Sequence, residues 1–170
     1  MSTVVGLSDL LDLRHMKRCF ALAAVLALAA LAAGSSASSA GAAACLPTIV
    51  DGGGPFGQGE PPIRAKIGTG LVLTGVVLGP NCRPIPRAHV QFWQSSKNGV
   101  YKLSGSGTVI TDKAGRFRFQ CPFPPQYEGL PPHVHIRVDA GDFLELVTRF
   151  VPTAGSHRGT LRLVLAPPDL

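Results

Sequence analysis

The chain has 170 residues, a length that suits one ordinary domain and leaves little room for two. It is 45% apolar and 15% charged, with a formal net charge of +6, but its charges stand singly between apolar residues. That pattern excludes the lysine and arginine runs of a nucleic-acid-binding protein and favours an acidic small molecule as the partner. The 20 Gly and 15 Pro disfavour a helical protein and favour short strands joined by tight turns.

Residues 1–44 have the pattern of a leader followed by a secretory signal peptide. A second methionine, Met16, stands directly before two basic residues, so translation is expected to start there. An apolar run of about 14 residues and then a stretch of small residues follow. The apolar run is shorter than the roughly 20 residues of a membrane span. We therefore expect an exported protein, periplasmic or extracellular, without a membrane span.

Removal of the leader leaves three cysteines, Cys45, Cys82 and Cys121, which allow one disulfide in an oxidising compartment. Cys45 follows three alanines, as in a bacterial lipoprotein signal, but the usual large aliphatic residue three positions earlier is missing. If Cys45 carries a lipid anchor, Cys82 and Cys121 form the natural pair; otherwise the pairing is open. The spacing of these cysteines does not match that of zinc ligands.

Residues 45–69 are rich in Gly and Pro and show little periodicity, which predicts an extended segment laid across the surface of the domain. Residues 70–170, in contrast, have the sequence pattern of β-strands. A period of two, clearest at Ala88, Val90 and Phe92, places alternate side chains on one face of a strand. Seven strands are expected, at residues 71–78, 88–93, 108–111, 116–120, 133–139, 143–151 and 160–165.

The spacing of these strands predicts an all-β protein, a single β-sandwich of about seven to eight short strands. Between two of the strands, residues 112–115 have the pattern of a hairpin connection with a glycine at its end. After this turn, Phe117 and Phe119 are expected to point one way and the arginines beside them the other. Trp93 is predicted to be a core or pocket-wall aromatic side chain.

Two histidines, His133 and His135, stand two residues apart on a predicted strand. Their side chains then leave the same face, with Cα atoms about 6.5 to 7 Å apart, and can share a metal ion. The alternative is that both are merely outward polar residues, opposite a core face made by the apolar residues at 134, 136 and 138.

The chain has two tyrosines, and neither lies in an obvious core pattern. Tyr101 follows a turn-like run, and Tyr127 lies in a proline-rich loop shortly before His133. Each one alone could be an ordinary surface residue. Two phenolates and two imidazoles together would make a specific site, because a hard, anionic oxygen prefers a hard trivalent ion such as Fe(3+).

Separate motifs follow one another in a family-like order, at residues 73–77, 82–94, 99–101, 111–117, 125–127, 132–135 and 146–148. Together they resemble the intradiol ring-cleavage dioxygenases, the family of the catechol and protocatechuate dioxygenases, in a secreted short form. The resemblance implies a β-sandwich with a non-haem Fe(3+) site whose ligands are Tyr101, Tyr127, His133 and His135. It also implies that a small catechol is cleaved by O2 between its two hydroxyls, to give a muconate-type diacid.

The resemblance also assigns catalytic roles. Tyr127 would leave the metal when substrate binds and take up a substrate proton. The family commonly has an arginine three residues before the first histidine, where this chain has Leu130. Arg149, which replaces the glutamine usual in the family, could return a positive charge to the site. The alternative for Arg149 is a solvated charge on a strand.

The sequence therefore supports an Fe(3+)-dependent intradiol dioxygenase as the first hypothesis. The second is an exported, catalytically degenerate β-sandwich that binds a metal or an aromatic ligand without turnover. It follows from Leu130, since a preorganised cation is typically worth about 2.7 to 4 kcal/mol of barrier. A third hypothesis is an adhesion-type sandwich without a metal. The oligomeric state is left open.

Overall fold

The structure is a computed structural model that describes residues 45–51, 59–126 and 129–168. The leader and signal peptide predicted for residues 1–44 lie outside these ranges. Within them, no helix is long and apolar enough to cross a membrane. Each of the seven predicted strands has a counterpart: β1 (Gly70–Leu78), β2 (His89–Ser95), β3 (Tyr101–Ile110), β4 (Arg116–Pro122), β5 (Val134–Asp139), β6 (Leu146–Phe150) and β7 (Arg158–Val164). The prediction for β3 is corrected, since this strand begins at Tyr101 and not at residue 108.

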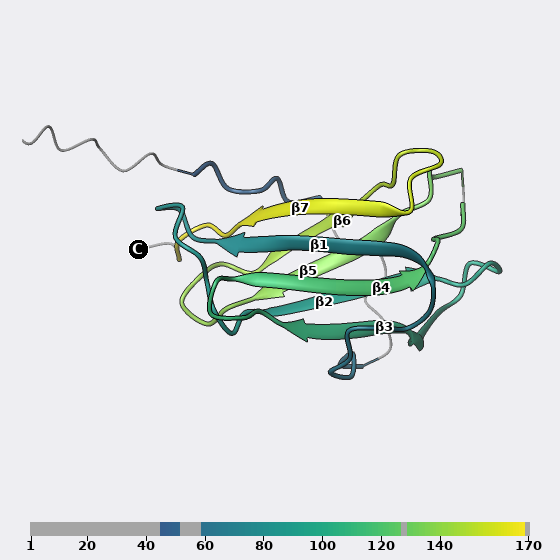
Figure 1. The fold of residues 1–170 in the computed structure, drawn as a ribbon, viewed down its shortest axis with the longest axis horizontal. Helices are drawn as coiled ribbons and strands as arrows, with labels where there is room; N and C mark the ends of the chain where they lie inside the picture. The colour runs from purple at the N-terminus through teal and green to yellow at the C-terminus, as the bar shows by residue number, and fades with distance from the viewer. Residues whose placement is uncertain (1–44, 52–58, 127–128, 169–170) are drawn as a thin grey trace, which may run out of the picture. The chain divides into compact units, whose positions relative to one another are not determined.

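The strands form two sheets that pack as a sandwich (Figure 1), so the predicted all-β architecture is confirmed. One sheet has three strands in the order β4-β1-β7, and the other has four in the order β3-β2-β5-β6. β1 and β7 run parallel, while the other neighbouring strands are antiparallel.

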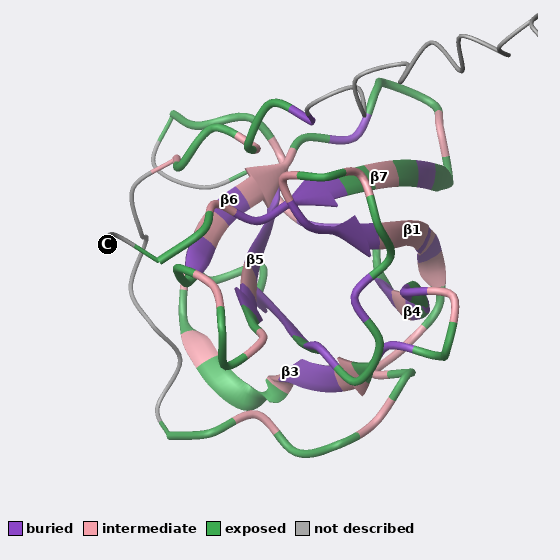
Figure 2. Ribbon diagram, turned by 90° about the vertical axis from the view of Figure 1, so that its left-hand side faces the viewer, coloured by how far each residue is buried: buried purple, intermediate pink, exposed green. Residues whose placement is uncertain are grey.

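The core lies between the sheets and is made by the alternate side chains that the period of two predicts. Val90 and Phe92 on β2 are fully buried, and Phe117 and Phe119 on β4 are buried opposite them. The rings of Phe92 and Phe119 stack with centroids 4.4 Å apart. Figure 2 shows such buried stretches on strands of both sheets, including β1, β5 and β7. Each large apolar side chain buried in this way stabilises the fold by about 1.5 to 3 kcal/mol.

The predicted hairpin at residues 112–115 is wrong, although its turn forms. Asp112 Oδ1 accepts hydrogen bonds from the backbone N–H groups of Ala114 and Arg116, and Gly115 takes a positive φ of 69°. The turn nevertheless joins β3 to β4, which belong to different sheets. Local turn residues reverse the chain, but which sheet the next strand joins depends on where its apolar face can be buried.

The first part of the predicted extended segment covers one open side of the sandwich. Residues 45–51, called here the N-terminal strap, run from β7 in one sheet to β6 in the other. Thr48 N donates to Val164 O at 2.9 Å, and Asp51 N donates to Val147 O at 3.1 Å. The strap thereby pairs backbone groups at two strand edges that would otherwise face water.

The second part of the segment covers the opposite side. Arg64 N donates to Thr108 O on β3, and Ile67 N donates to Gln120 O on β4. Arg64 also donates through its guanidinium to the carbonyl oxygen of Ser106. The extended segment therefore closes both open sides of the sandwich, so it is part of the scaffold as well as of the surface.

The disulfide pairing that the sequence leaves open is Cys45–Cys82, with Cα atoms 5.1 Å apart. Cys121 is a free thiol, fully buried on β4, and this burial raises its pKa to about 12. The pairing of Cys82 with Cys121, which is expected only with a lipid anchor at Cys45, does not form. Because the Cys45 sulfur is bonded to Cys82, it has no valence for a thioether-linked lipid, and the structure favours the disulfide over a lipid anchor at Cys45.

The double substitution Cys45→Ser and Cys82→Ser is expected to lower the free energy of unfolding by about 2 to 4 kcal/mol, because this bond links residues 37 apart and constrains the unfolded chain. Urea unfolding of the oxidised protein measures the change. In the folded parent protein, a thiol reagent should leave Cys121 unmodified. An unchanged urea midpoint in the double variant would contradict the structural role of the bond.

Candidate metal centre

The candidate ligands meet on the face of the four-stranded sheet that points away from the core. His135 lies on β5, opposite Trp93 of β2 and Arg149 of β6 in the strand register. His133 directly precedes β5, and Tyr101 is the first residue of β3. Both histidines do face outward, opposite the core residues of β5, but they are only 5% exposed and so are buried polar groups.

Three donor atoms lie close together at this point. The Nε2 atoms of His133 and His135 are 3.1 Å apart, and the hydroxyl oxygen of Tyr101 is 3.2 Å from Nε2 of His135. Two ligand atoms at about 2.1 Å from one metal ion, at right angles to each other, are about 3 Å apart. The observed spacings therefore suit neighbouring ligands of a single metal ion.

A backbone contact sets the tautomer of His133. Its Nδ1 atom is 2.8 Å from the carbonyl oxygen of Pro131. A carbonyl only accepts, so Nδ1 carries the proton and Nε2 of the neutral ring keeps its lone pair. Metal-bound histidines usually donate their second N–H in this way, which fixes both tautomer and ring orientation.

The surroundings of His135 keep its ring neutral. The pKa of His135 is lowered to about 4: burial is the largest cause, the neighbouring His133 and Arg149 act in the same direction, and the negative charge of Asp51 opposes them. The neutral imidazole is the form that binds a metal ion. His135 is therefore ready to act as a ligand over the whole neutral range of pH.

Trp93 fixes the orientation of the His135 ring. The indole is almost fully buried, and it stacks on the imidazole with centroids 5.2 Å apart and an interplanar angle of 12°. Trp93 points away from the sandwich core, so the structure makes it a wall of the candidate site. Its sequence neighbour Phe92 faces the core instead.

The remaining predicted site residues lie as follows. Tyr127 is outside the described residues. Leu130 is 41% exposed and brings no charge to the position where the family commonly has arginine. Arg149 does lie beside His135, but its Nε atom is 2.5 Å from Oδ2 of Asp51. The sequence reading missed Asp51, because no motif or periodicity links the N-terminal strap to β6.

The donor set decides which metal suits the site. In the part of the chain that the structure describes, no three His, Cys, Asp or Glu side chains come together. In addition to the two imidazoles, the described residues therefore offer the phenol oxygen of Tyr101 as a ligand. Phenolate oxygen is hard and anionic, so the set favours a hard trivalent ion over zinc. The residues present fit Fe(3+).

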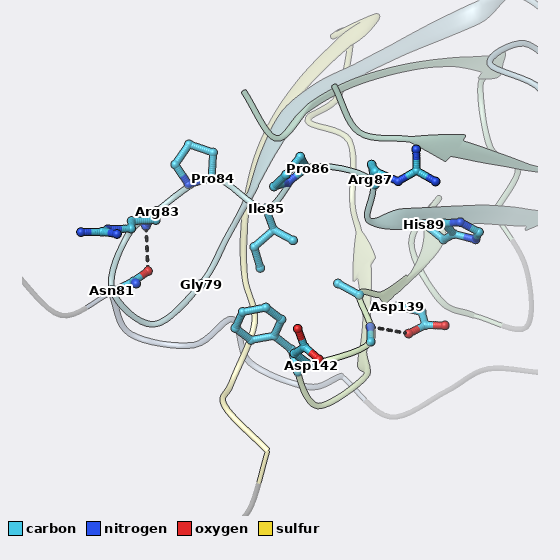
Figure 3. Close-up of a pocket in the computed structure, with 13 residues that line it drawn as sticks. Gly79, Asn81, Arg83, Pro84, Ile85, Pro86, Arg87, His89, Asp139 and Asp142 are labelled. Atoms are coloured by element: carbon cyan, nitrogen blue, oxygen red, sulfur yellow. Dashed lines mark hydrogen bonds between the residues drawn. The ribbon is translucent and has the colours of Figure 1, made fainter. Parts of the chain in front are cut away.

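Two hollows in the described residues lie away from these donors. The larger, about 510 Å³, is found between the loop before β2 and the loop after β5, and Figure 3 shows Ile85 pointing into it. The smaller, about 270 Å³, has Gln94 among its lining residues. Neither is lined by Tyr101, His133 or His135, so the candidate centre is defined by its donor atoms and not by a cavity.

No protein-family model matches the chain. It is 29% identical to the "Putative dioxygenase" of Rickettsia bellii, in a match that covers 48% of this chain and 49% of that protein. The match therefore spans about half the length of this curated relative.

Solved structures extend the comparison to most of the described fold. The dioxygenase domain of a dioxygenase carbohydrate-binding protein fusion from Streptomyces sp. SirexAA-E has a TM-score of 0.63 and 24% identity, over 71% of this chain and 99% of that one. An intradiol ring-cleavage dioxygenase from Tetranychus urticae has a TM-score of 0.63 and 21% identity, over 74% and 97%. Chlorocatechol 1,2-dioxygenase from Pseudomonas putida has a TM-score of 0.57 and 19% identity, over 66% and 70%.

These similarities define the class of the fold, which is that of the intradiol ring-cleavage dioxygenases. The resemblance predicted from the ordered sequence motifs is thereby confirmed.

The low pKa of His135 makes the stability of the metal-free protein depend on pH. The unfolded chain protonates His135 below pH about 6.5, but the folded chain does so only below pH about 4. Stability from this residue is therefore complete above pH 6.5 and is lost as the pH falls toward 4, by at most about 1.4 kcal/mol per pH unit. Urea unfolding at several pH values gives the free energy of unfolding as a function of pH. Between pH about 4 and 6.5 it should change less with pH in His135→Gln than in the parent protein. An equal pH dependence of the two proteins would contradict the prediction.

Proposed function

We propose that the chain is a non-haem Fe(3+)-dependent intradiol dioxygenase, which inserts O2 into a small catechol between its hydroxyl-bearing carbons and yields a muconate-type diacid. One observation carries this proposal: Nε2 of His135 lies 3.1 Å from Nε2 of His133 and 3.2 Å from the phenol oxygen of Tyr101. The similarity in fold to solved intradiol dioxygenases supports the choice of reaction.

Each residue of the site would have a separate task. Fe(3+), when bound, would supply the Lewis acidity that lowers the pKa of the catechol hydroxyls and prepares the ring for O2. His133 and His135 would hold it through Nε2, and Tyr101 through its phenol oxygen. Trp93 would keep the His135 ring in place, and the phenolate oxygen of Tyr127 would accept a proton from a catechol hydroxyl and become a neutral phenol.

We place this activity outside the cytoplasm. The predicted signal peptide at residues 1–44 supports export, and the disulfide between Cys45 and Cys82 is the kind of bond that persists in oxidising compartments. The partners of the protein would then be a small catechol and O2, met in the periplasm or outside the cell.

A second function, binding of a metal or aromatic ligand without turnover, is favoured by a different observation. Leu130 brings no cation, and Arg149 is paired with Asp51. A site without a free preorganised cation would stabilise developing negative charge less well. The two functions share the same metal centre and differ in whether bound catechol reacts.

The iron-loaded protein is expected to be burgundy, because charge transfer from tyrosinate to Fe(3+) absorbs visible light. Tyr101→Phe removes one of the two candidate tyrosinates, so it should weaken and shift the visible band while urea stability of the metal-free protein stays close to that of the parent. Visible spectra with metal analysis of the same samples give the result. A colourless parent protein with one bound Fe(3+) would reject the tyrosine ligation.

Turnover is expected to appear as O2 uptake when the ferric protein is mixed with catechol, protocatechuate or hydroxyquinol, with a diacid as product. His135→Ala should remove both bound iron and uptake, since it deletes a ligand. A visible band that shifts on addition of each diol without O2 uptake would instead support the binding function.

A further inference from the structure

Asp51 and Arg149 form an ion pair beside the candidate metal centre. The Oδ2 atom of Asp51 lies 2.5 Å from Nε of Arg149, and Arg149 stands opposite His135 in the register of β5 and β6. Both charges act on His135, and they act in opposite directions. The pair therefore lies within electrostatic reach of the ligand atoms, and its two charges largely cancel there.

We propose that Asp51 masks the positive charge of Arg149 and so sets the affinity of the metal centre for an anionic aromatic diol. This inference rests on the proposed function, because it concerns how that site binds its substrate. A catechol that loses its hydroxyl protons carries negative charge, which a nearby cation attracts. Leu130 brings no such charge, so Arg149 is the cation beside His135 and Asp51 controls how much of its charge the diol meets.

The N-terminal strap holds Asp51 in place. Its backbone N–H bonds to Val147 O on β6, two residues before Arg149, and Thr48 ties the strap to β7 through two hydrogen bonds with Val164. The disulfide of Cys45 anchors the start of the strap. Asp51 therefore meets Arg149 through a built part of the scaffold.

Substitution by asparagine separates charge from shape. Asn at position 51 keeps an oxygen that accepts a hydrogen bond from Arg149 Nε, but it removes the negative charge. Asp51→Asn then leaves one uncompensated positive charge beside the metal centre. Arg149→Gln leaves one uncompensated negative charge, and the double variant leaves the pair neutral, as in the parent.

The experiment is an anaerobic titration of the ferric full-length protein with catechol, followed by the shift of the visible band. Asp51→Asn should bind catechol about tenfold more tightly than the parent, and Arg149→Gln about tenfold more weakly. The double variant should return to the parent affinity. All four proteins should bind the same amount of iron, since neither residue is a ligand, and the differences should shrink at high salt.

Glu145→Gln is the matched control. It removes the carboxylate of another ion pair, in which Arg137 Nη2 is 2.6 Å from Glu145 Oε2. Glu145 directly precedes β6, the strand that carries Arg149. Arg137 lies on β5, two residues beyond His135 and on the same face of the sheet. The net charge changes by the same amount as in Asp51→Asn, so a catechol affinity within twofold of the parent shows that the effect is local.

The outcomes separate the inference from the function on which it rests. Tighter binding by Asp51→Asn, with the double variant restored to the parent value, supports masking. Binding by Asp51→Asn that is unchanged or weaker than in a coloured, catechol-binding parent overturns the masking role and leaves the metal centre intact. A ferric parent that is colourless or insensitive to catechol overturns the proposed function itself. Asp51→Glu, which keeps the charge, should behave as the parent does.

Discussion

The chemistry proposed for this protein depends on one contact, the approach of two imidazole Nε2 atoms to 3.1 Å in buried surroundings. Both nitrogens cannot carry protons at that distance without repulsion, and burial away from water adds to the penalty on a charged ring. The Pro131 carbonyl places the proton of His133 on the far side of its ring. The lone pair of His133 Nε2 is thereby left on the side of the ring that faces His135, where a metal ion would meet both imidazoles.

The scaffold supports this contact from both sides of the sheet. The inward residues of β2 and β5 pack in the core, and this packing fixes how the two strands are aligned. The outward residues of the same strands therefore meet in register. Trp93 lies opposite His135 for that reason, and its ring fixes the imidazole by stacking. The two parts of the extended segment close the sides of the sandwich, and the disulfide attaches one of them.

Charge is where this chain departs from the family it resembles. Leu130 stands where the family commonly has arginine, and the cation that does lie beside His135 is held by a carboxylate from a segment far away in the sequence. The side chains of Arg149 and Asp51 are 34% and 39% exposed, so their attraction contributes little to stability. The pair instead determines how much of the positive charge of Arg149 a ligand meets at the site.

The sequence alone predicted the order of the strands, the inward faces of β2 and β4 and the candidate ligands Tyr101, His133 and His135, because alternation and short motifs are local properties of the chain. It placed the start of β3 too late. Only the tertiary structure decided the rest. The turn at residues 112–115 was read as a hairpin, yet it crosses between sheets, since the burial of Phe117 and Phe119 and not the turn chooses the sheet of β4. The Cys45–Cys82 bond and the Asp51–Arg149 pair join residues distant in the sequence, so their partners are set by how the strap packs against β6 and β7, which no local pattern encodes.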